Sequence, residues 1–579
     1  MRDITANRSA TTAIRTHPPR GHSRRVAQAH AEVGHTEVSR PVAVSLAAVF
    51  VATIAAVPIS QAWMDRSVLR VVPEATAGGM ARVDGLSPIA RVIERNRRLL
   101  AAIHRFSDRL DTDSLLARHL RPAVQLLLAE RLGSGNERVY LGRDDWLYYA
   151  TDVHHVVGRG FLDPGQLARR AAAGDSLVAA VTPDPRPALR TFNDALARRD
   201  ITLVLLPTPV KPSIHPEPLG AGTSVPPLRN VSFSQFADEM RAAGVLLFDP
   251  APLLANLSAA GEATYLTRDT HWRPHAVAAV AQALAQFLER EVPLPEPTPI
   301  SLETRRTTVS NTGDIIGLLD LPTGALYPSE TVAVRQILMP GGGPWRPDPR
   351  ADVLLLGDSF TNIFSLDAMG WGTAAGLAEQ LSFALGRPLD RLVQNANGAF
   401  ASRELLAREL AVGRDRLDGK RVVVYQFATR ELTHGDWRVV AIDDLDIRAP
   451  MSTLESGRVL TPEPGQILTV QGRIRQVTAA PRPGSVPYRD HIIAVDLGEI
   501  DTAGALDTAD PDARALVYLS SMEDNVWTAA ARLVVGQTIR LTLRPWAEVA
   551  AELDGITRTE LVEGLVVFAE PWWGTFVER

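Results

Sequence analysis

Between residues 190 and 440, short apolar runs alternate with segments of helical periodicity. The apolar runs lie at 201–206, 244–248, 352–356, 391–394 and 421–427, and the helical segments lie at 191–199, 232–243, 275–290, 376–385 and 401–412. The apolar runs are continuous, which is typical of strands buried on both faces. Strands that alternate with helices form a parallel sheet with helices on both faces. The sequence therefore predicts an α/β fold.

Polar residues follow these strands at the edge where ligands collect in open parallel sheets. They are Lys211, Asp249, Asp358, Ser359, Asn395, Asn397, Gly398, Arg430 and Glu431. Ser359 stands where a strand turns into a helix, so backbone N–H groups there can stabilise an oxyanion while the hydroxyl projects forward. Serine is equally favoured at this place as a helix N-cap. The local sequence leaves both interpretations open.

A base and a carboxylate for Ser359 are available in the segment 264–277. Asp269 and His271 are two residues apart, a spacing that lets the carboxylate orient the imidazole while its other nitrogen takes the serine proton. A helix start at Pro274, capped by the residues before it, explains the same segment. A metal site of Asp269, His271 and His275 is a further alternative.

Two ordered blocks make the chain resemble a known family. YLTRDTHW at 265–272 precedes VLLLGDSF at 353–360, and this combination resembles the SGNH-hydrolase-like domain of the alginate O-acetylation proteins AlgJ and AlgX. Further matching blocks lie at 139–149, 203–219, 311–319, 395–409 and 426–437. The family resembles a circularly permuted SGNH hydrolase, with Asp-x-His ahead of the serine, and that order is present here. The resemblance covers about 135–440 and the segments before it.

The resemblance implies a role for each of the three residues. Ser359 is expected to be the nucleophile, His271 the base and Asp269 the residue that orients the base. The resemblance leaves three interpretations: an acetyltransferase, an esterase with the same residues, and an inert SGNH fold that only binds a glycan. The presence of all three residues, Ser359, His271 and Asp269, argues against the inert fold.

Four other residues are expected near the substrate. Asn397 and Gly398 are expected at the oxyanion hole or a substrate loop, with a plain turn as the alternative. Lys211 and Arg430 are expected to bind an anionic glycan or product, with a structural salt bridge as the alternative.

The N-terminal region predicts a membrane anchor. No charged residue occurs over 41–64, and a membrane-spanning helix needs roughly 20 apolar residues. We therefore expect a disordered cytoplasmic tail at 1–40, a transmembrane helix at 41–64, and a helical lead-in at 65–134 outside the cytoplasm. A cleaved signal peptide ending near Ala62 is the alternative.

The predicted catalytic domain spans 135–449, and the composition changes after it. Strand-like segments separated by Gly, Pro and Asp predict a β-rich accessory domain at 450–579, either a barrel or a sandwich. We expect 80–450 to fold without it. The aromatic residues Trp546, Trp572 and Trp573 are expected either to stack on sugars or to lie in the core.

The expected function is transfer of acetyl groups to hydroxyls of an exported polysaccharide or cell-surface glycan, at the inner membrane on the periplasmic side. The family resemblance implies a multi-spanning membrane acyltransferase as the acetyl supplier and no cofactor. A carbohydrate acetylesterase would use the same triad. The net charge of −5 gives no indication of a nucleic-acid partner, and the lack of cysteine excludes disulfides and thiol nucleophiles.

Overall fold

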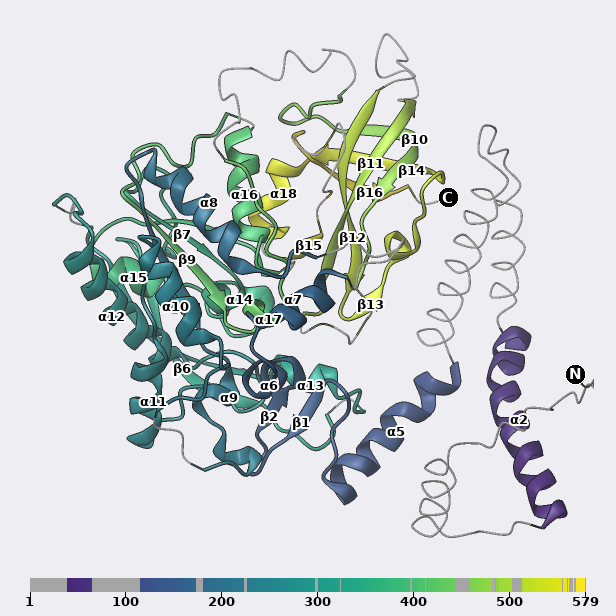
Figure 1. Cartoon of the computed structure of the whole chain (residues 1–579). Coiled ribbons are helices and arrows are strands. Elements are labelled where there is room, and N and C mark those ends of the chain that lie inside the picture. The colour runs from purple at the N-terminus through teal and green to yellow at the C-terminus, as the bar shows by residue number, and fades with distance from the viewer. Residues whose placement is uncertain are drawn as a thin grey trace, which may run out of the picture. The chain divides into compact units, whose positions relative to one another are not determined.

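The computed structural model describes the chain over residues 39–64, 115–172, 181–222, 226–296, 300–322, 324–395, 398–411, 413–442, 459–501 and 513–577, the last two ranges with short gaps (Figure 1). The chain divides into two units, Met1–Leu116 and Ala117–Arg579. The second unit contains both the α/β region and the C-terminal strands.

The apolar N-terminal run forms the helix α2 (Arg40–Met64). In the described part of the chain, no helix is both long and apolar enough to cross a membrane. The predicted transmembrane helix at 41–64 is therefore not supported. Of the predicted lead-in, α5 (Leu115–Leu132) is described, whereas 65–114 lies outside the described residues.

A five-stranded parallel sheet forms the centre of the α/β region. Its order is β4 (Leu246–Leu247), β3 (Thr202–Thr208), β9 (Val422–Ala428), β7 (Val353–Gly357) and β8 (Asp390–Val393). All four neighbouring pairs are parallel. Every residue of β7 and β9 is buried, which confirms that the continuous apolar runs mark strands covered on both faces.

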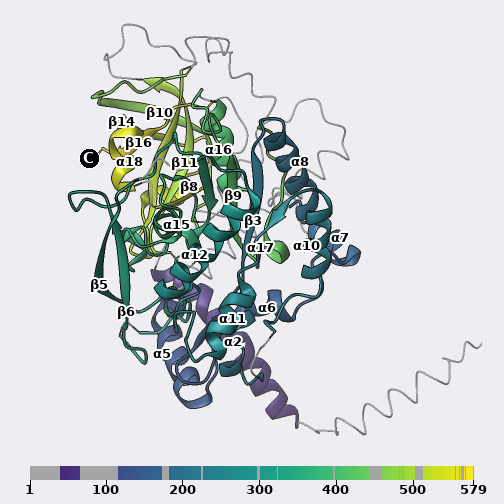
Figure 2. The same cartoon turned by 90° about the vertical axis from the view of Figure 1, so that its left-hand side faces the viewer.

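Two separate hydrophobic cores lie on opposite faces of this sheet. Alternate residues of β3 enter different cores: Val204 and Leu206 enter one, Leu203 and Leu205 the other. The first core includes α11 (Ala251–Ala259), α12 (Pro274–Glu291) and α15 (Leu377–Leu385); the second includes α8 (Pro185–Ala197), α10 (Phe233–Ala242) and α16 (Ala401–Ala411). Figure 2 shows α12 and α15 on one side of the sheet and α8 and α10 on the other. The three-layer α/β fold is confirmed.

Two antiparallel ribbons are separate from the five-stranded sheet. The shorter ribbon consists of β1 (Val139–Leu141) and β2 (Leu147–Tyr149), which pair from Val139↔Tyr149 to Leu141↔Leu147. The longer ribbon, β5 (Glu303–Asn311) with β6 (Glu330–Leu338), has no counterpart in the sequence analysis. Most residues of β5 are exposed, so this strand lacks the apolar pattern that identifies a strand.

The C-terminal strands form a separate sheet that closes on itself. Its strands are β10 (Leu468–Val477), β11 (His491–Asp501), β12 (Arg514–Glu523), β13 (Val526–Trp527), β14 (Thr538–Pro545), β15 (Thr557–Thr559) and β16 (Trp572–Phe576) (light green and yellow in Figure 1). The pairings run β12–β16–β14–β10–β11 and return from β11 to β12, so these five strands form a closed barrel. The β-rich prediction is confirmed, with the barrel form realised.

The three tryptophans of this region are core residues. Trp572 is fully buried in the hydrophobic cluster formed by the barrel strands. Trp546 and Trp573 belong to a second cluster that also contains residues of α18 (Trp546–Leu553). Their rings pack against protein, so the expectation that they stack on sugars is wrong and the core alternative holds.

Candidate active site

Ser359 lies directly after β7, at the first position of the short helix α14 (Ser359–Asn362). The N-cap of that helix is Asp358, whose carboxylate accepts a hydrogen bond from Phe360 N at 2.9 Å. The second oxygen of Asp358 accepts from Ala428 N at 2.8 Å and so fixes the turn to β9. Because Asp358 performs the capping, the N-cap interpretation of Ser359 is wrong and its hydroxyl is available for another role.

His271 connects Ser359 to Asp269. His271 Nε2 lies 2.8 Å from Ser359 Oγ, and His271 Nδ1 lies 2.6 Å from Asp269 Oδ1. All three side chains are buried. The structure thus brings together the three residues that the sequence predicted, from segments 88 positions apart.

Trp272 holds the two segments in register. Its indole N–H donates to Phe360 O at 3.0 Å, which links the histidine segment to the serine helix. An isolated bridge between Tyr265 and Trp272 closes the loop that carries Asp269 and His271. Asp269 and His271 therefore lie in a short loop that is closed by this bridge and is joined to the serine helix by the Trp272 hydrogen bond.

The carboxylate of Asp269 is surrounded by donors. Besides His271, its Oδ2 accepts from the Trp371 indole at 2.9 Å and from Asp314 N at 3.1 Å. Burial by itself would raise the pKa of Asp269, but the hydrogen bonds from His271 and Trp371 outweigh it and hold the pKa at about 2. Burial opposes a charged imidazole, yet the neighbouring Asp269 raises the pKa of His271 above its usual value. The neighbouring Asp269 thus favours the protonated form of His271.

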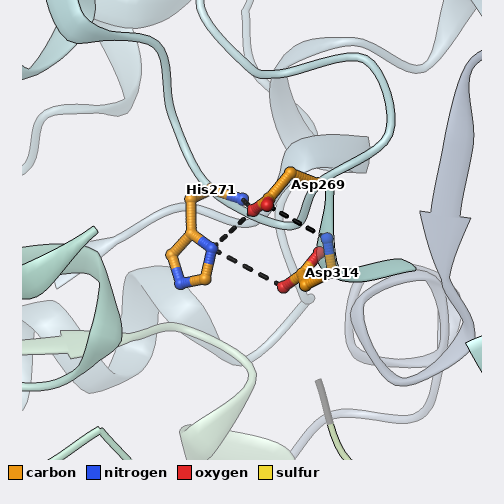
Figure 3. A group of neighbouring side chains, drawn as sticks. All are labelled: Asp269, His271 and Asp314. Carbon is orange, nitrogen blue, oxygen red and sulfur yellow. Dashed lines mark hydrogen bonds and ion pairs between the residues drawn. The ribbon is translucent and has the colours of Figure 1, made fainter. Parts of the chain in front are cut away.

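Asp314 is a second carboxylate at the histidine, which the sequence analysis did not single out (Figure 3). Its Oδ2 lies 3.6 Å from His271 Nδ1 and accepts from the Thr270 hydroxyl at 2.6 Å, while its Oδ1 accepts from Thr270 N at 2.8 Å. Burial and the nearby charge of Asp269 raise the pKa of Asp314 to about 7. The block 311–319 was a usable signal, since Asp314 is its one carboxylate.

The residues that could hold a metal ion differ from the set expected from the sequence. In the described part of the chain, the group that could hold a metal ion is Asp269, His271 and Asp314, without His275. His275 is about half exposed and faces Glu262 at 3.7 Å. The facing oxygens of both aspartates accept hydrogen bonds from protein donors, and the 2.6 Å contact of Asp269 with His271 is itself a hydrogen bond. The donor set fits a hydrogen-bond network better than a metal site.

Lys211 is a structural residue. Its ammonium group is buried and donates to Leu147 O at 2.8 Å and to Thr267 O at 3.2 Å, so it joins the β1–β2 ribbon to the segment before Asp269. Burial lowers the pKa of Lys211 to about 8. The anion-binding expectation for Lys211 is therefore wrong, because both carbonyl contacts point its charge into the protein.

Arg430 and Gly398 line cavities beside Ser359. Arg430 donates to Asp152 at 3.2 Å, and its guanidinium lies over the Phe360 ring at 5.6 Å. Arg430 thus lines the site and forms an ion pair at the same time. Gly398 has φ +80°. Asn397 lies outside the described residues.

Ser359 faces two cavities, of about 220 and about 250 Å³. The first also contains Asp269, His271 and Asp314, and the second also contains Asn395, Gly398 and Glu431. Residues of the C-terminal region, Tyr488 and Arg489 among them, line the first cavity. Sequence reasoning missed these, because no local pattern shows that residues 130 positions away reach the serine.

The chain is similar to proteins of polysaccharide acetylation. Residues 139–428, half of the chain, match the family model described as SGNH hydrolase-like domain, acetyltransferase AlgX. A probable alginate O-acetylase AlgJ of Pseudomonas putida is 27% identical over 187 residues, covering 32% of this chain and 43% of the relative. A probable alginate O-acetylase AlgJ of Azotobacter vinelandii is 23% identical and covers 52% of this chain and 71% of the relative. The match thus spans less than half the length of the Pseudomonas putida relative.

Solved structures are also similar in part. The O-acetyltransferase domain of Pseudomonas putida AlgJ matches 52% of this chain and 93% of that domain, with 22% identity and a TM-score of 0.37. Pseudomonas aeruginosa AlgX matches 70% of this chain and 91% of that protein, with 15% identity and a TM-score of 0.36.

Proposed function

Because this chain belongs to the family of the SGNH hydrolase-like domain of the acetyltransferase AlgX, we propose that it transfers acetyl groups to hydroxyls of a polysaccharide. The observation that carries the proposal is the continuous hydrogen-bonded chain from Ser359 through His271 to Asp269. A serine, a base and an orienting carboxylate at these distances are the requirements for acyl transfer through a covalent intermediate. We infer the acyl group, acetyl, and the class of acceptor, a polysaccharide, from the names of the relatives.

In the proposed first step, Ser359 Oγ attacks the carbonyl carbon of an acetyl donor and gives its proton to His271 Nε2. Asp269 accepts from His271 Nδ1 and stabilises the imidazolium. The tetrahedral intermediate collapses when the bond to the donor oxygen or sulfur breaks, and that atom takes the proton from His271. The products are acetyl-Ser359 and the free donor.

In the second step, a sugar hydroxyl attacks the acetyl carbonyl carbon and gives its proton to His271. The bond to Ser359 Oγ breaks, and the proton returns to that oxygen. We assign stabilisation of the negative oxygen in both steps to polar groups around the second cavity, with Asn395 and the backbone of Gly398 as candidates. Water in place of the sugar gives an esterase with the same residues.

The location and acetyl supply are part of the same proposal. We place the catalytic domain outside the cytoplasm at the inner membrane, where a membrane acyltransferase would supply the acetyl group. A reporter enzyme fused after residue 114 that is active only in the cytoplasm contradicts this location.

The test of the proposed function uses the full chain with p-nitrophenyl acetate as donor. Ser359→Ala and His271→Ala are each expected to lower the turnover by roughly 10³-fold or more. The double variant is expected to be little worse than either single variant, because the two side chains act as a unit. A folded Ser359→Ala protein with wild-type turnover contradicts the mechanism. Addition of an oligosaccharide then separates transfer from hydrolysis, because transfer yields acetylated sugar at the expense of free acetate.

A further inference from the structure

The two cavities at Ser359 share five residues, and four of them belong to the α/β region. The shared residues are Tyr149, Ser359, Asn395, Arg430 and Tyr488. Only Tyr488 comes from the C-terminal region. The accessory domain thus contributes one residue, Tyr488, to the boundary between the two cavities at Ser359.

The segment of Tyr488 is held in place by its own domain. It leads directly into β11, and the Tyr488 ring stacks on His491 at a centroid distance of 5.9 Å. Asp490 Oδ1 accepts from Asp524 N, and Arg489 O accepts from Asn525 N, both at 2.8 Å. Asp524 and Asn525 both have positive φ, as in the tight turns that join two strands. The turn between β12 and β13 therefore holds the two residues that directly follow Tyr488.

The accessory domain is also fixed against the catalytic sheet. Gln394, which lines the second cavity directly after β8, donates to Arg558 O at 3.2 Å. The preceding residues of the same segment, Ile556 and Thr557, line the first cavity. The contact holds the accessory domain at the edge of the sheet where Ser359 lies.

Tyr488 is not part of the apolar core of its own domain. It belongs to neither hydrophobic cluster of the C-terminal region and is only partly buried. Burial and the nearby Tyr149 raise the pKa of the Tyr488 phenol, so this group is neutral. A partly exposed, neutral aromatic ring beside an arginine is a suitable surface for a sugar ring. The C–H face of the sugar can pack on the Tyr488 ring, and Arg489 offers hydrogen-bond donors to the sugar hydroxyls.

We propose that Tyr488 and Arg489 form the acceptor wall of the active site and hold a pyranose unit of the polysaccharide so that its hydroxyl, rather than water, reaches acetyl-Ser359. This inference rests on the proposed acyl transfer. It assigns the C-terminal domain a specificity-determining role: the ratio of transfer to hydrolysis depends on two of its residues. In this step the sugar hydroxyl oxygen attacks the acetyl carbonyl carbon, the bond to Ser359 Oγ breaks, and the hydroxyl proton passes through His271 to Ser359 Oγ.

The experiment compares two products in the full chain. p-Nitrophenyl acetate is the donor, and alginate oligosaccharides or cello-oligosaccharides are the acceptors, which separates an anionic from a neutral pyranose chain. Free acetate and acetylated sugar are both measured. Tyr488→Ala is expected to lower the ratio of acetylated sugar to acetate about tenfold, because loss of one aromatic contact removes about that much binding. Tyr488→Phe is expected to restore most of the ratio, because it keeps the ring.

Arg489 provides a matched pair with a control. Arg489→Ala is expected to lower the ratio, whereas Arg475→Ala is expected to leave both products unchanged. Both arginines lie on the C-terminal domain, are largely exposed and face a carboxylate, Asp524 and Glu499 respectively. If Tyr488→Ala is unstable by thermal denaturation, the Arg489 pair decides.

The outcomes separate this inference from the proposed function. A wild-type chain without Ser359-dependent acetate release contradicts the proposed function itself. An active wild type whose ratio is the same in Tyr488→Ala and Arg489→Ala contradicts only the acceptor wall. A wild type that releases acetate and acetylates neither acceptor also overturns the wall, and then the esterase interpretation holds.

Discussion

His271 is in contact with two carboxylates in different states. Asp269 receives hydrogen bonds from His271, Trp371 and the backbone, so its pKa stays near 2. Asp314 is buried beside that negative charge, so its pKa rises to about 7. Two like charges within a few ångströms disfavour ionisation of one of them. Asp269 is therefore the ionised carboxylate at His271, and Asp314 changes its protonation near neutral pH.

Asp314→Asn is expected to move the acid limb of the rate profile to lower pH. The rate falls as pH decreases through the pKa of His271, because imidazolium cannot accept the serine proton. Asp314 raises that pKa, so its removal lowers it, and the variant keeps activity at a pH where the wild type has lost it. The measurement is p-nitrophenyl acetate turnover between pH 5 and 9.

The control for this variant is Asp320→Asn. Asp320 is also a partly buried carboxylate with a raised pKa, but it pairs with Arg138 at 2.6 Å and does not line the cavities at Ser359. Its profile is expected to match the wild type. An acid limb that stays in place in Asp314→Asn would show that Asp314 does not influence His271.

At the scale of elements, the loop before α13 (Asp314–Leu318) positions both aspartates. Gly313 precedes this helix with φ +94°, and a Cβ there would collide with the carbonyl of Arg268. That carbonyl belongs to the residue next to Asp269, and Asp314 N donates to Asp269. A glycine is required because only glycine adopts this backbone without strain and leaves room for the approach.

Gly313→Ala is expected to destabilise the protein by about 2 kcal/mol or more, from positive-φ strain and the collision. It should also lower turnover, since Asp269 loses its place. Gly317→Ala is the matched control within α13, because in the described part of the chain no atom outside this helix lies within 4 Å of its added Cβ, and alanine favours a helix. Chemical denaturation of both variants is the measurement. Equal stability of the two would contradict the proposed close approach.

The sequence predicts the elements that have a clear hydrophobic pattern and the residues whose side chains are typical of a serine catalytic site. The buried strands, the β-rich C-terminus and the trio of Ser359, His271 and Asp269 all have such signals. β5 was missed because it is polar and exposed. Lys211 was assigned to the site because it follows a strand, but its direction into the protein depends on carbonyls of distant segments. Contacts of Asp314 and Tyr488 with the site likewise depend on the fold, which no local pattern encodes.

At the scale of the whole molecule, no hydrophobic cluster formed by the described residues contains residues from both sides of the boundary near residue 450. The two cores of the α/β sheet contain residues only up to Ile442, and the two C-terminal clusters begin at Val459. The contacts across the boundary include polar ones, such as Arg408 to Leu561 O at 3.3 Å and the ion pair Arg414–Glu570 at 2.6 Å. An exposed ion pair of this kind contributes about 0–1 kcal/mol.

A chain that ends at residue 449 is therefore expected to fold, because the described hydrophobic clusters of the α/β region contain no residue beyond Ile442. It should unfold cooperatively in thermal denaturation and still release acetate from p-nitrophenyl acetate, at a rate that depends on Ser359. Its transfer to an oligosaccharide should be lost, since Tyr488 and Arg489 are absent. Ser359→Ala in the shortened chain is the control that assigns the released acetate to this site. An insoluble product, or one without a cooperative transition, would show that the accessory domain is required for folding. In that case the polar contacts at Gln394, Arg408 and Arg414 contribute more to the stability of the chain than contacts of this kind usually do.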